Sequence, residues 1–190
     1  MDDNQLMLRV QQGDEDAFRR IVEAHQKPIL NLCFRFVGNQ QDAEEVAQDV
    51  FIHLYRSAAT YRPTARLSTY LYRIAVNLSL NRIRDRKRKR LFSLDALKSD
   101  RRLEPTHPDG APDLILERME LQAQIRKALD SLPESQRTAV VLKRFEGLSY
   151  EEIADVMRCS VSAVESLLHR AKVGLRTKLG PLKSNAGFTG

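Results

Sequence analysis

The chain has 190 residues, of which 42% are apolar, enough to bury a core as one ordinary domain or as two small ones. No window reaches the length of an apolar membrane span, and the N-terminal MDDNQLMLRV is acidic, unlike a secretory signal. These features exclude membrane insertion and predict a cytoplasmic protein.

Cysteine and histidine are sparse. Cys33 and Cys159 each lie in an apolar-periodic segment, which predicts buried, reduced thiols. The four histidines show no metal-ligand spacing, and no histidine, acid and nucleophile cluster stands out. We therefore expect no catalytic residue, no metal site and no cofactor.

Positive charge is concentrated in one part of the chain. Residues 1–60 carry 6 basic and 10 acidic side chains, whereas residues 61–90 carry 10 basic and 1 acidic. Seven cations fall within the nine residues from Arg82 to Arg90. This distribution indicates a surface that follows nucleic-acid phosphates more than general basicity.

Helical periodicity dominates, and no stretch alternates as a strand does, so we expect an all-α protein. Residues 93–113 hold three of the seven prolines and read as a flexible linker. The linker would join two small helical domains, 1–92 and 114–182, with a disordered tail over 183–190.

In the first domain, Asn39 is a predicted N-cap, and apolar side chains recur behind it at helical spacing. This expected core stripe consists of Ala43, Val46, Ala47, Val50, Phe51, Leu54 and Tyr55. The opposite face is acidic and polar, and spacing alone leaves open whether it is merely solvated or binds a partner. Its candidate partner-binding residues are Asp42, Glu45, Gln48 and Asp49.

A second helix is predicted from Ser68, which can serve as its N-cap. At 100° per residue, Tyr72 falls on an apolar sector, whereas Tyr70 falls on a polar arc with cations and amides. Tyr70 and the preceding Tyr61 are thus candidates for contact with nucleic acid. The complete candidate set here is Tyr61, Arg62, Arg66, Ser68, Tyr70, Arg73, Asn77, Asn81 and Arg84.

Residues 147–179 have the pattern of a helix-turn-helix. Ser149 with Glu152 forms a capping-box signature, and a second helix is expected to start at Ser160 or Ser162 after a short turn. The outward face of that second helix offers short polar groups first and cations later, as major-groove recognition requires. Its candidate DNA-binding residues are Ser162, Glu165, Ser166, His169, Arg170, Lys172 and Arg176.

Three blocks, in this order and spacing, resemble bacterial sigma factors of the extracytoplasmic-function (ECF) class of the sigma-70 family. They are DAEEVAQDVFIHLYR, ARLSTYLYRIAVNLSLNRIR and LDSLPESQRTAVVLKRFEGLSYEEIADVMRCSVSAVESLLHRAK. The resemblance implies a region 2 helical bundle, a region 4 helix-turn-helix, and promoter-specific transcription initiation without enzymatic activity. It also implies core RNA polymerase, promoter DNA and an anti-sigma factor as partners.

In that family, the helix matching 42–55 docks on the polymerase, residues 61–84 recognise and help open the minus 10 element, and the helix-turn-helix binds the minus 35 element. Two positions depart from the pattern: Tyr70 stands where Trp is frequent, and Glu165 stands where many relatives carry a basic residue. A different minus 35 preference is therefore expected.

Other classes explain less of the chain. A stand-alone helix-turn-helix regulator accounts for residues 147–179 but not for the first domain. A nuclease lacks the clusters that its chemistry needs, and a protein-only adaptor leaves the basic run unexplained.

Overall fold

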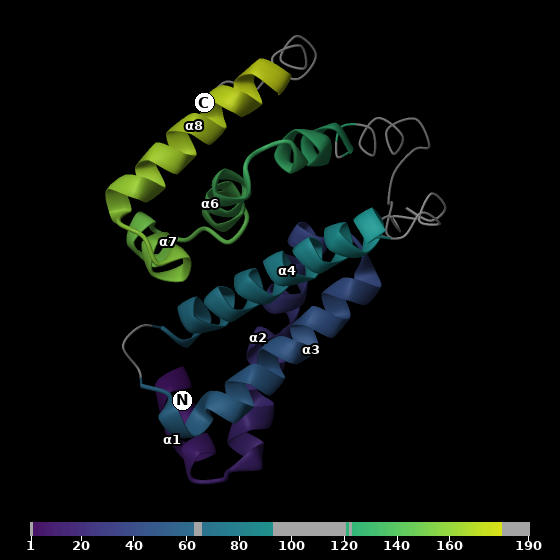
Figure 1. The fold of residues 1–190 in the computed structure, drawn as a ribbon. Coiled ribbons are helices and arrows are strands. Elements are labelled where there is room, and N and C mark those ends of the chain that lie inside the picture. The colour runs from purple at the N-terminus through teal and green to yellow at the C-terminus, as the bar shows by residue number, and fades with distance from the viewer. Residues whose placement is uncertain (1, 63–65, 93–120, 122, 180–190) are drawn as a thin grey trace, which may run out of the picture. The chain divides into compact units, whose positions relative to one another are not determined.

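The computed structural model describes residues 2–62, 66–92, 121 and 123–179. The chain divides into two compact units, Met1–Glu104 and Pro105–Gly190. Every secondary-structure element within the described residues is helical (Figure 1). The predicted linker over 93–113 and the predicted tail over 183–190 lie outside those residues.

The first unit is a bundle of three long helices with a shorter one on its side. The helices are α1 (Asp3–Gln11), α2 (Glu15–Val37), α3 (Gln40–Ser57), the 3₁₀ turn η1 (Ala58–Thr60) and α4 (Leu67–Phe92). Each of α2, α3 and α4 packs on the other two, and α1 packs on α2 and η1 (Figure 1). The bundle thus presents α3 and α4 side by side.

Local signals set the ends of these helices. Asp14 accepts the Ala17 amide proton at 2.9 Å, and this bond, with the nearby Arg9, holds the pKa of Asp14 below its ordinary value. Gly38 ends α2 at φ 82°, a left-handed conformation that glycine adopts without strain. Asn39 then caps α3 by accepting the Asp42 amide proton at 2.8 Å, as predicted.

The core of this unit confirms most of the predicted stripe on α3. Ala43, Val50 and Leu54 are fully buried, as are Leu71 and Ala75 of α4. Tyr55 was wrongly placed in the stripe, because its side chain is 53% exposed. The helix predicted from about Ser68 begins at Leu67, which is buried. Ser68 therefore lies within the first turn, half-buried, and is not the N-cap residue that the sequence suggested.

The second unit contains helical residues 123–130 followed by α6 (Glu134–Arg144), α7 (Tyr150–Met157) and α8 (Val161–Leu179). The last three pack on one another. A small core joins Leu132 and Val140 to Ala171, with Leu168 and Leu175 packed around it. Ile153 and Val164 are fully buried where α7 and α8 meet, so apolar packing fixes the direction of α8.

The two cysteines differ in environment. Cys33 is fully buried, as predicted, and burial raises the pKa of its thiol from 9.0 to about 11. Cys159 lies in the turn before α8 and is only partly buried, so the expectation of a buried thiol was wrong there. The short turn leaves the Cys159 side chain partly open to solvent.

Candidate functional site

The turn between α7 and α8 is tightly specified. Ser149 and Glu152 form the predicted reciprocal capping box, with bonds of 3.1 and 2.9 Å. Arg158 then adopts a left-handed backbone conformation at φ 53°, and Ser160 starts α8 by accepting the Ala163 amide proton at 3.2 Å. These bonds orient α8 independently of its outward side chains.

All seven candidate residues on α8 are exposed (Ser162, Glu165, Ser166, His169, Arg170, Lys172 and Arg176). Four of them, from Glu165 to Arg170, line a shallow open hollow. Ser166 donates to the Ser162 carbonyl at 3.0 Å, and Arg170 donates to the Ser166 carbonyl at 3.3 Å. The face combines a carboxylate, hydroxyls and cations on a rigid helix, which suits hydrogen bonding to base edges and phosphates.

The polar arc of α4 is also at the surface. Asn77, Asn81 and Arg84 are exposed, and Arg84 donates to the Asn81 amide oxygen at 3.4 Å. Tyr70 and Arg73, one turn closer to the helix start, are half-buried. The arc therefore runs from a shielded aromatic end to an open amide and cationic end.

Tyr70 is held on several sides. Its hydroxyl lies 3.1 Å from the Ser57 hydroxyl, and its ring meets the Tyr61 ring edge to face with centroids 5.3 Å apart. The Arg73 guanidinium lies over the Tyr70 ring, 5.0 Å from its centroid. The aromatic group is thus oriented before any ligand is present.

Tyr61 differs from the exposed contact expected from the sequence. Its side chain is only 8% exposed, and burial raises the pKa of its phenol. The hydroxyl donates to Asn4 of α1 at 3.4 Å. Tyr61 therefore packs behind Tyr70, whereas the neighbouring candidates Arg62 and Arg66 are exposed.

The acidic face of α3 is divided between two environments. Asp42 pairs with Arg82 at 3.1 Å and with Arg86 at 3.6 Å, and Glu45 also pairs with Arg82. Gln48 and Asp49, one turn further along α3, are exposed. Two of the four candidate partner-binding residues thus join α3 to α4, and the other two face outward.

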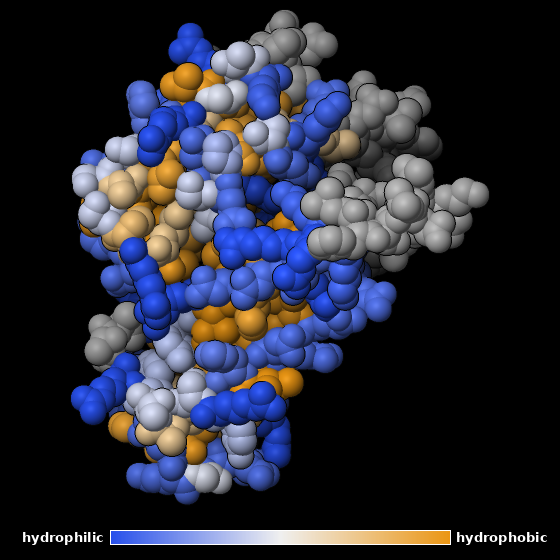
Figure 2. Space-filling model, viewed as in Figure 1, coloured by the Kyte–Doolittle hydropathy of each residue, from blue (hydrophilic) through white to orange (hydrophobic). Residues whose placement is uncertain are grey.

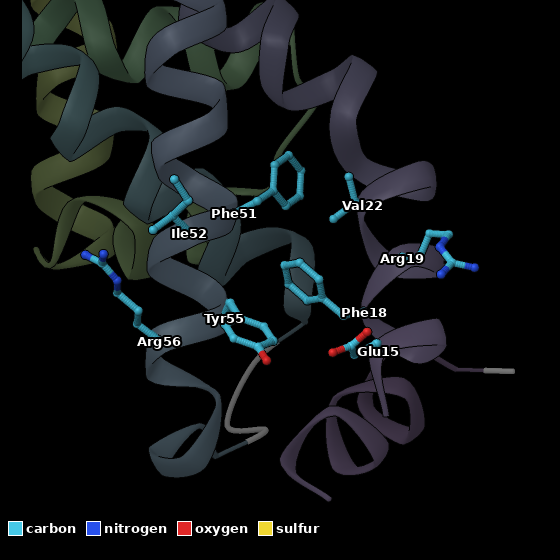
Figure 3. Close-up of a pocket in the computed structure, with 8 residues that line it drawn as sticks. All are labelled: Glu15, Phe18, Arg19, Val22, Phe51, Ile52, Tyr55 and Arg56. Carbon is cyan, nitrogen blue, oxygen red and sulfur yellow. The ribbon is translucent and has the colours of Figure 1, made fainter. Parts of the chain in front are cut away.

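An apolar groove lies between α2 and α3, beyond Asp49 (Figure 3). Phe18 and Val22 of α2 point toward Phe51 and Tyr55 of α3, and the Phe18 and Tyr55 rings meet edge to face at 5.0 Å. Ile52 is 46% exposed beside them. Sequence periodicity missed this groove because it assigned Tyr55 to the core.

Further exposed cations lie toward the C-terminal end of α4. Lys87, Arg88 and Lys89 are exposed, and Arg88 pairs with Asp85 at 2.9 Å. On the face drawn in Figure 2, hydrophilic residues gather over the half of α4 that carries the basic run. Arg82 and Arg86 of that run instead face the α3 carboxylates.

No group of three or more His, Cys, Asp or Glu side chains among the described residues is placed to hold a metal ion. No helix in the described part of the chain is both long and apolar enough to cross a bilayer.

Comparison with solved structures places the fold. The complex of CnrH with the cytosolic domain of CnrY matches with a TM-score of 0.68 at 24% identity, over 97% of this chain and 99% of that one. The sigma factor RpoE of Bartonella quintana, in complex with the anti-sigma factor NepR, matches with a TM-score of 0.67 at 21% identity, over 86% and 96% of the two chains. At these identities the likeness concerns the fold.

Sequence comparison gives the family. Sigma-70 region 2 matches residues 21–89, and Sigma-70 region 4 matches residues 122–174. The RNA polymerase sigma-H factor of Pseudomonas aeruginosa is 39% identical over 97% of both chains. The ECF sigma factor SigW of Bacillus subtilis is 35% identical over 92% of this chain and 95% of its own, and the ECF sigma-E factor of Escherichia coli is 35% identical over 95% of each. The chain belongs to the ECF RNA polymerase sigma factors of the sigma-70 family.

Proposed function

We propose that this sigma factor binds core RNA polymerase through α3, reads the minus 35 element with α8, and holds an unpaired minus 10 base at the polar arc of α4. The observation that carries the proposal is the outward face of α8, where all seven candidate residues are exposed on a helix whose first turn is held by Ser160. Polymerase works on the chromosome, so the proposed site of action is the cytoplasm.

At the minus 35 element, the α8 face sorts its contacts along the helix. Ser162, Glu165 and Ser166 lie in the first turns and contact base edges. Lys172 and Arg176 lie further along and contact phosphates. A carboxylate accepts from the cytosine amino group, so Glu165 favours a cytosine at one position.

At the minus 10 element, Tyr70 and Arg73 form the stacking surface. The guanidinium already lies over the Tyr70 ring, and bases stack on both aromatic rings and guanidinium planes. An unpaired base either stacks on Arg73 or replaces it over the ring. Stacking at about 1 to 3 kcal/mol per base offsets part of the cost of unpairing, which is about a few kcal/mol.

Phosphate contacts add sequence-independent affinity. The exposed cations Arg62, Arg84, Lys87 and Lys89 supply it in the first unit. Arg82 and Arg86 belong instead to the ion pairs that join α4 to α3. Each phosphate contact makes the affinity for DNA depend more steeply on salt concentration: the slope of log K against log salt becomes more negative by about 0.9.

For polymerase binding, we place the interface at Gln48, Asp49 and the adjoining groove of Ile52 and Tyr55. Asp42 and Glu45 are already neutralised by arginines of α4, so they contribute less to binding a partner than Asp49 does. The groove adds exposed apolar area next to the exposed carboxylate of Asp49, which is typical of a protein interface with a polar rim. Core polymerase is the occupant that this placement favours.

An anti-sigma factor is a further proposed partner. Of the two structurally similar proteins, CnrH was solved with the cytosolic domain of CnrY bound, and the sigma factor RpoE was solved with the anti-sigma factor NepR bound. An inhibitor that covered the apolar groove of this chain would compete directly with polymerase.

The test is DNA binding with and without core polymerase. The purified chain, core polymerase and a library of randomised promoter fragments are combined, and bound and transcribed fragments are sequenced. We expect particular fragments to be enriched only when polymerase is present. The enriched fragments should share two sequence elements separated by a spacer of constant length. Selection of one element by the chain alone would favour the stand-alone regulator.

A further inference from the structure

The first helix, α1, makes hydrogen bonds to the segment just before α4, which lies far from it in sequence. The Gln11 side-chain amide donates one hydrogen bond to the Ala58 carbonyl and another to the Tyr61 carbonyl, each 2.9 Å long. A primary amide has two N–H groups. Both are used on the short segment that connects α3 to the start of the polar arc.

The same helix also holds the Tyr61 side chain. Asn4 accepts a hydrogen bond from the Tyr61 hydroxyl at 3.4 Å. The Tyr61 ring in turn meets Tyr70 edge to face. A chain of contacts therefore runs from Gln11 and Asn4 through Tyr61 to Tyr70.

α1 is itself fixed firmly enough to serve as a support. Leu6, Met7 and Val10 are buried against the bundle. Asp3 lies 3.0 Å from the His25 side chain of α2. The position of Gln11 is thus set by the packing of α1 on the bundle, to which η1 also contributes.

We infer that Gln11 is a positioning residue for promoter opening: it fixes the Tyr61 backbone and, through the Tyr61 ring, the orientation of Tyr70. This inference rests on the proposed minus 10 role of Tyr70. It assigns α1 a part in base capture although none of the residues proposed to contact a base belongs to α1.

The geometry allows this role to be separated from folding. The Gln11 residue is exposed at the surface, so replacing it opens no cavity in the core. Its two bonds end on the carbonyls of Ala58 and Tyr61, which are buried residues, so the thermal midpoint is measured together with opening. Without the bonds, Tyr61 and Tyr70 regain conformational freedom that base capture must then remove.

The decisive variant is Gln11→Met, which keeps a side chain of similar length and removes both donors without adding a charge. Gln11→Ala is the second variant. Gln5→Ala is the matched control, because Gln5 is exposed on the same helix. Each is assembled with core polymerase on promoters that carry either the preferred minus 10 sequence or single changes in it, and strand opening is followed with a fluorescent base analogue.

We expect Gln11→Met to reduce opening on the preferred promoter about two- to twelvefold, the size that follows from having to order one side chain on base capture. The preference for that promoter over altered ones should shrink as well. Polymerase affinity and the thermal midpoint of the free protein should stay close to those of Gln5→Ala.

Two results would overturn the inference. One is opening equal to that of Gln5→Ala. The other is a uniform loss on every minus 10 sequence together with a lower thermal midpoint, which indicates a purely structural role. Full opening by Tyr70→Ala would instead show that the proposed minus 10 function itself is wrong.

Discussion

The outward face of α8 and the polar arc of α4 are both proposed to contact DNA, but they are built differently. On α8, the polar contacts of Ser166 and Arg170 stay within the helix. On α4, Tyr70 engages Ser57, Tyr61 and Arg73, and Arg82 reaches the carboxylates of α3. One face is a row of separate contacts and the other is part of a network.

The difference has a physical consequence. On a rigid face whose residues make separate contacts, the free-energy effects of substitutions are additive. Within one network of contacts, those effects are not additive. Reading a duplex requires fixed side chains at known spacings. Capturing an unpaired base requires an aromatic group oriented in advance, which lowers the entropic cost of binding.

The largest effect is expected at Tyr70. Tyr70→Ala removes the stacking ring and should lower promoter opening by about 1 to 3 kcal/mol, or roughly five- to 150-fold. Polymerase affinity should stay unchanged. Because Arg73 lies over the same ring, the double variant Tyr70→Ala/Arg73→Ala should lose less than the two single losses combined. If the loss of opening in the double variant equalled the two single losses combined, α4 would behave as α8 does.

On α8, the expected effect is a change in base preference. Glu165→Gln should alter discrimination at one minus 35 position by about 1 to 3 kcal/mol. Lys172→Ala should weaken all sequences alike and reduce the salt slope by about 0.9. For the double variant, the loss of binding free energy should equal the sum of the losses of the two single variants, measured as holoenzyme affinity at several salt concentrations. A strong interaction between the two would remove the contrast with α4.

The two thiols sharpen the comparison of the two units. Burial raises the pKa of the Cys33 thiol from 9.0 to about 11, so the folded state disfavours its thiolate. Below pH 9 the thiol is protonated in both states and does not lower the free energy of unfolding. As the pH rises from 9 toward 11, ionisation in the unfolded chain lowers the free energy of unfolding, by about 1.4 kcal/mol at pH 10. Cys33→Ala should lack this part of the alkaline loss in denaturation curves. Near neutral pH a thiol reagent should label Cys159 well before Cys33; the opposite order would contradict the packing of α2.

The divided acidic face of α3 predicts a divided response. Asp42→Ala removes pairs with Arg82 and Arg86 and should lower the free energy of unfolding by about 1 kcal/mol. Asp49→Ala should change stability by less than about 0.5 kcal/mol and weaken polymerase binding instead. Urea denaturation and polymerase titration check both. If Asp42→Ala weakened polymerase binding as much as Asp49→Ala with no loss of stability, the ion pairs would not have the role assigned to them.

The smallest expected effect is a gain of stability in the α7–α8 turn. Arg158 has φ 53°, which costs a non-glycine residue about 1 to 2 kcal/mol. Arg158→Gly relieves this strain but adds about 0.5 to 1 kcal/mol of backbone entropy in the unfolded chain. The net gain should be about 0.5 kcal/mol in thermal denaturation, with minus 35 preference unchanged. A loss of stability would mean that the Arg158 side chain supports α8.

Local signals made much of this fold predictable. The caps at Asn39 and Ser149 act within three residues of themselves, so their patterns could be read directly from the sequence. The polar arc of α4 followed from helical spacing alone, and Asn77 and Asn81 are indeed exposed.

Long-range contacts could not be predicted in the same way. Arg82 and Asp42 are far apart in sequence, and their pairing depends on how α3 packs on α4. The burial of Tyr61 depends on α1, which carries no signature of its own. Tyr55 has the spacing of a core residue, but at the edge of the stripe it faces the groove with Phe18.

The central claim is that one chain reads two promoter elements on behalf of polymerase. Mapping transcript 5′ ends after overproduction of the protein tests this most directly, because every new start reports both elements at once. We predict that new starts share a minus 10 motif and a minus 35 motif at constant spacing, and that Tyr70→Ala lowers their use at least about fivefold. New starts that share no minus 10 motif, or whose use is unchanged with Tyr70→Ala, would contradict the account.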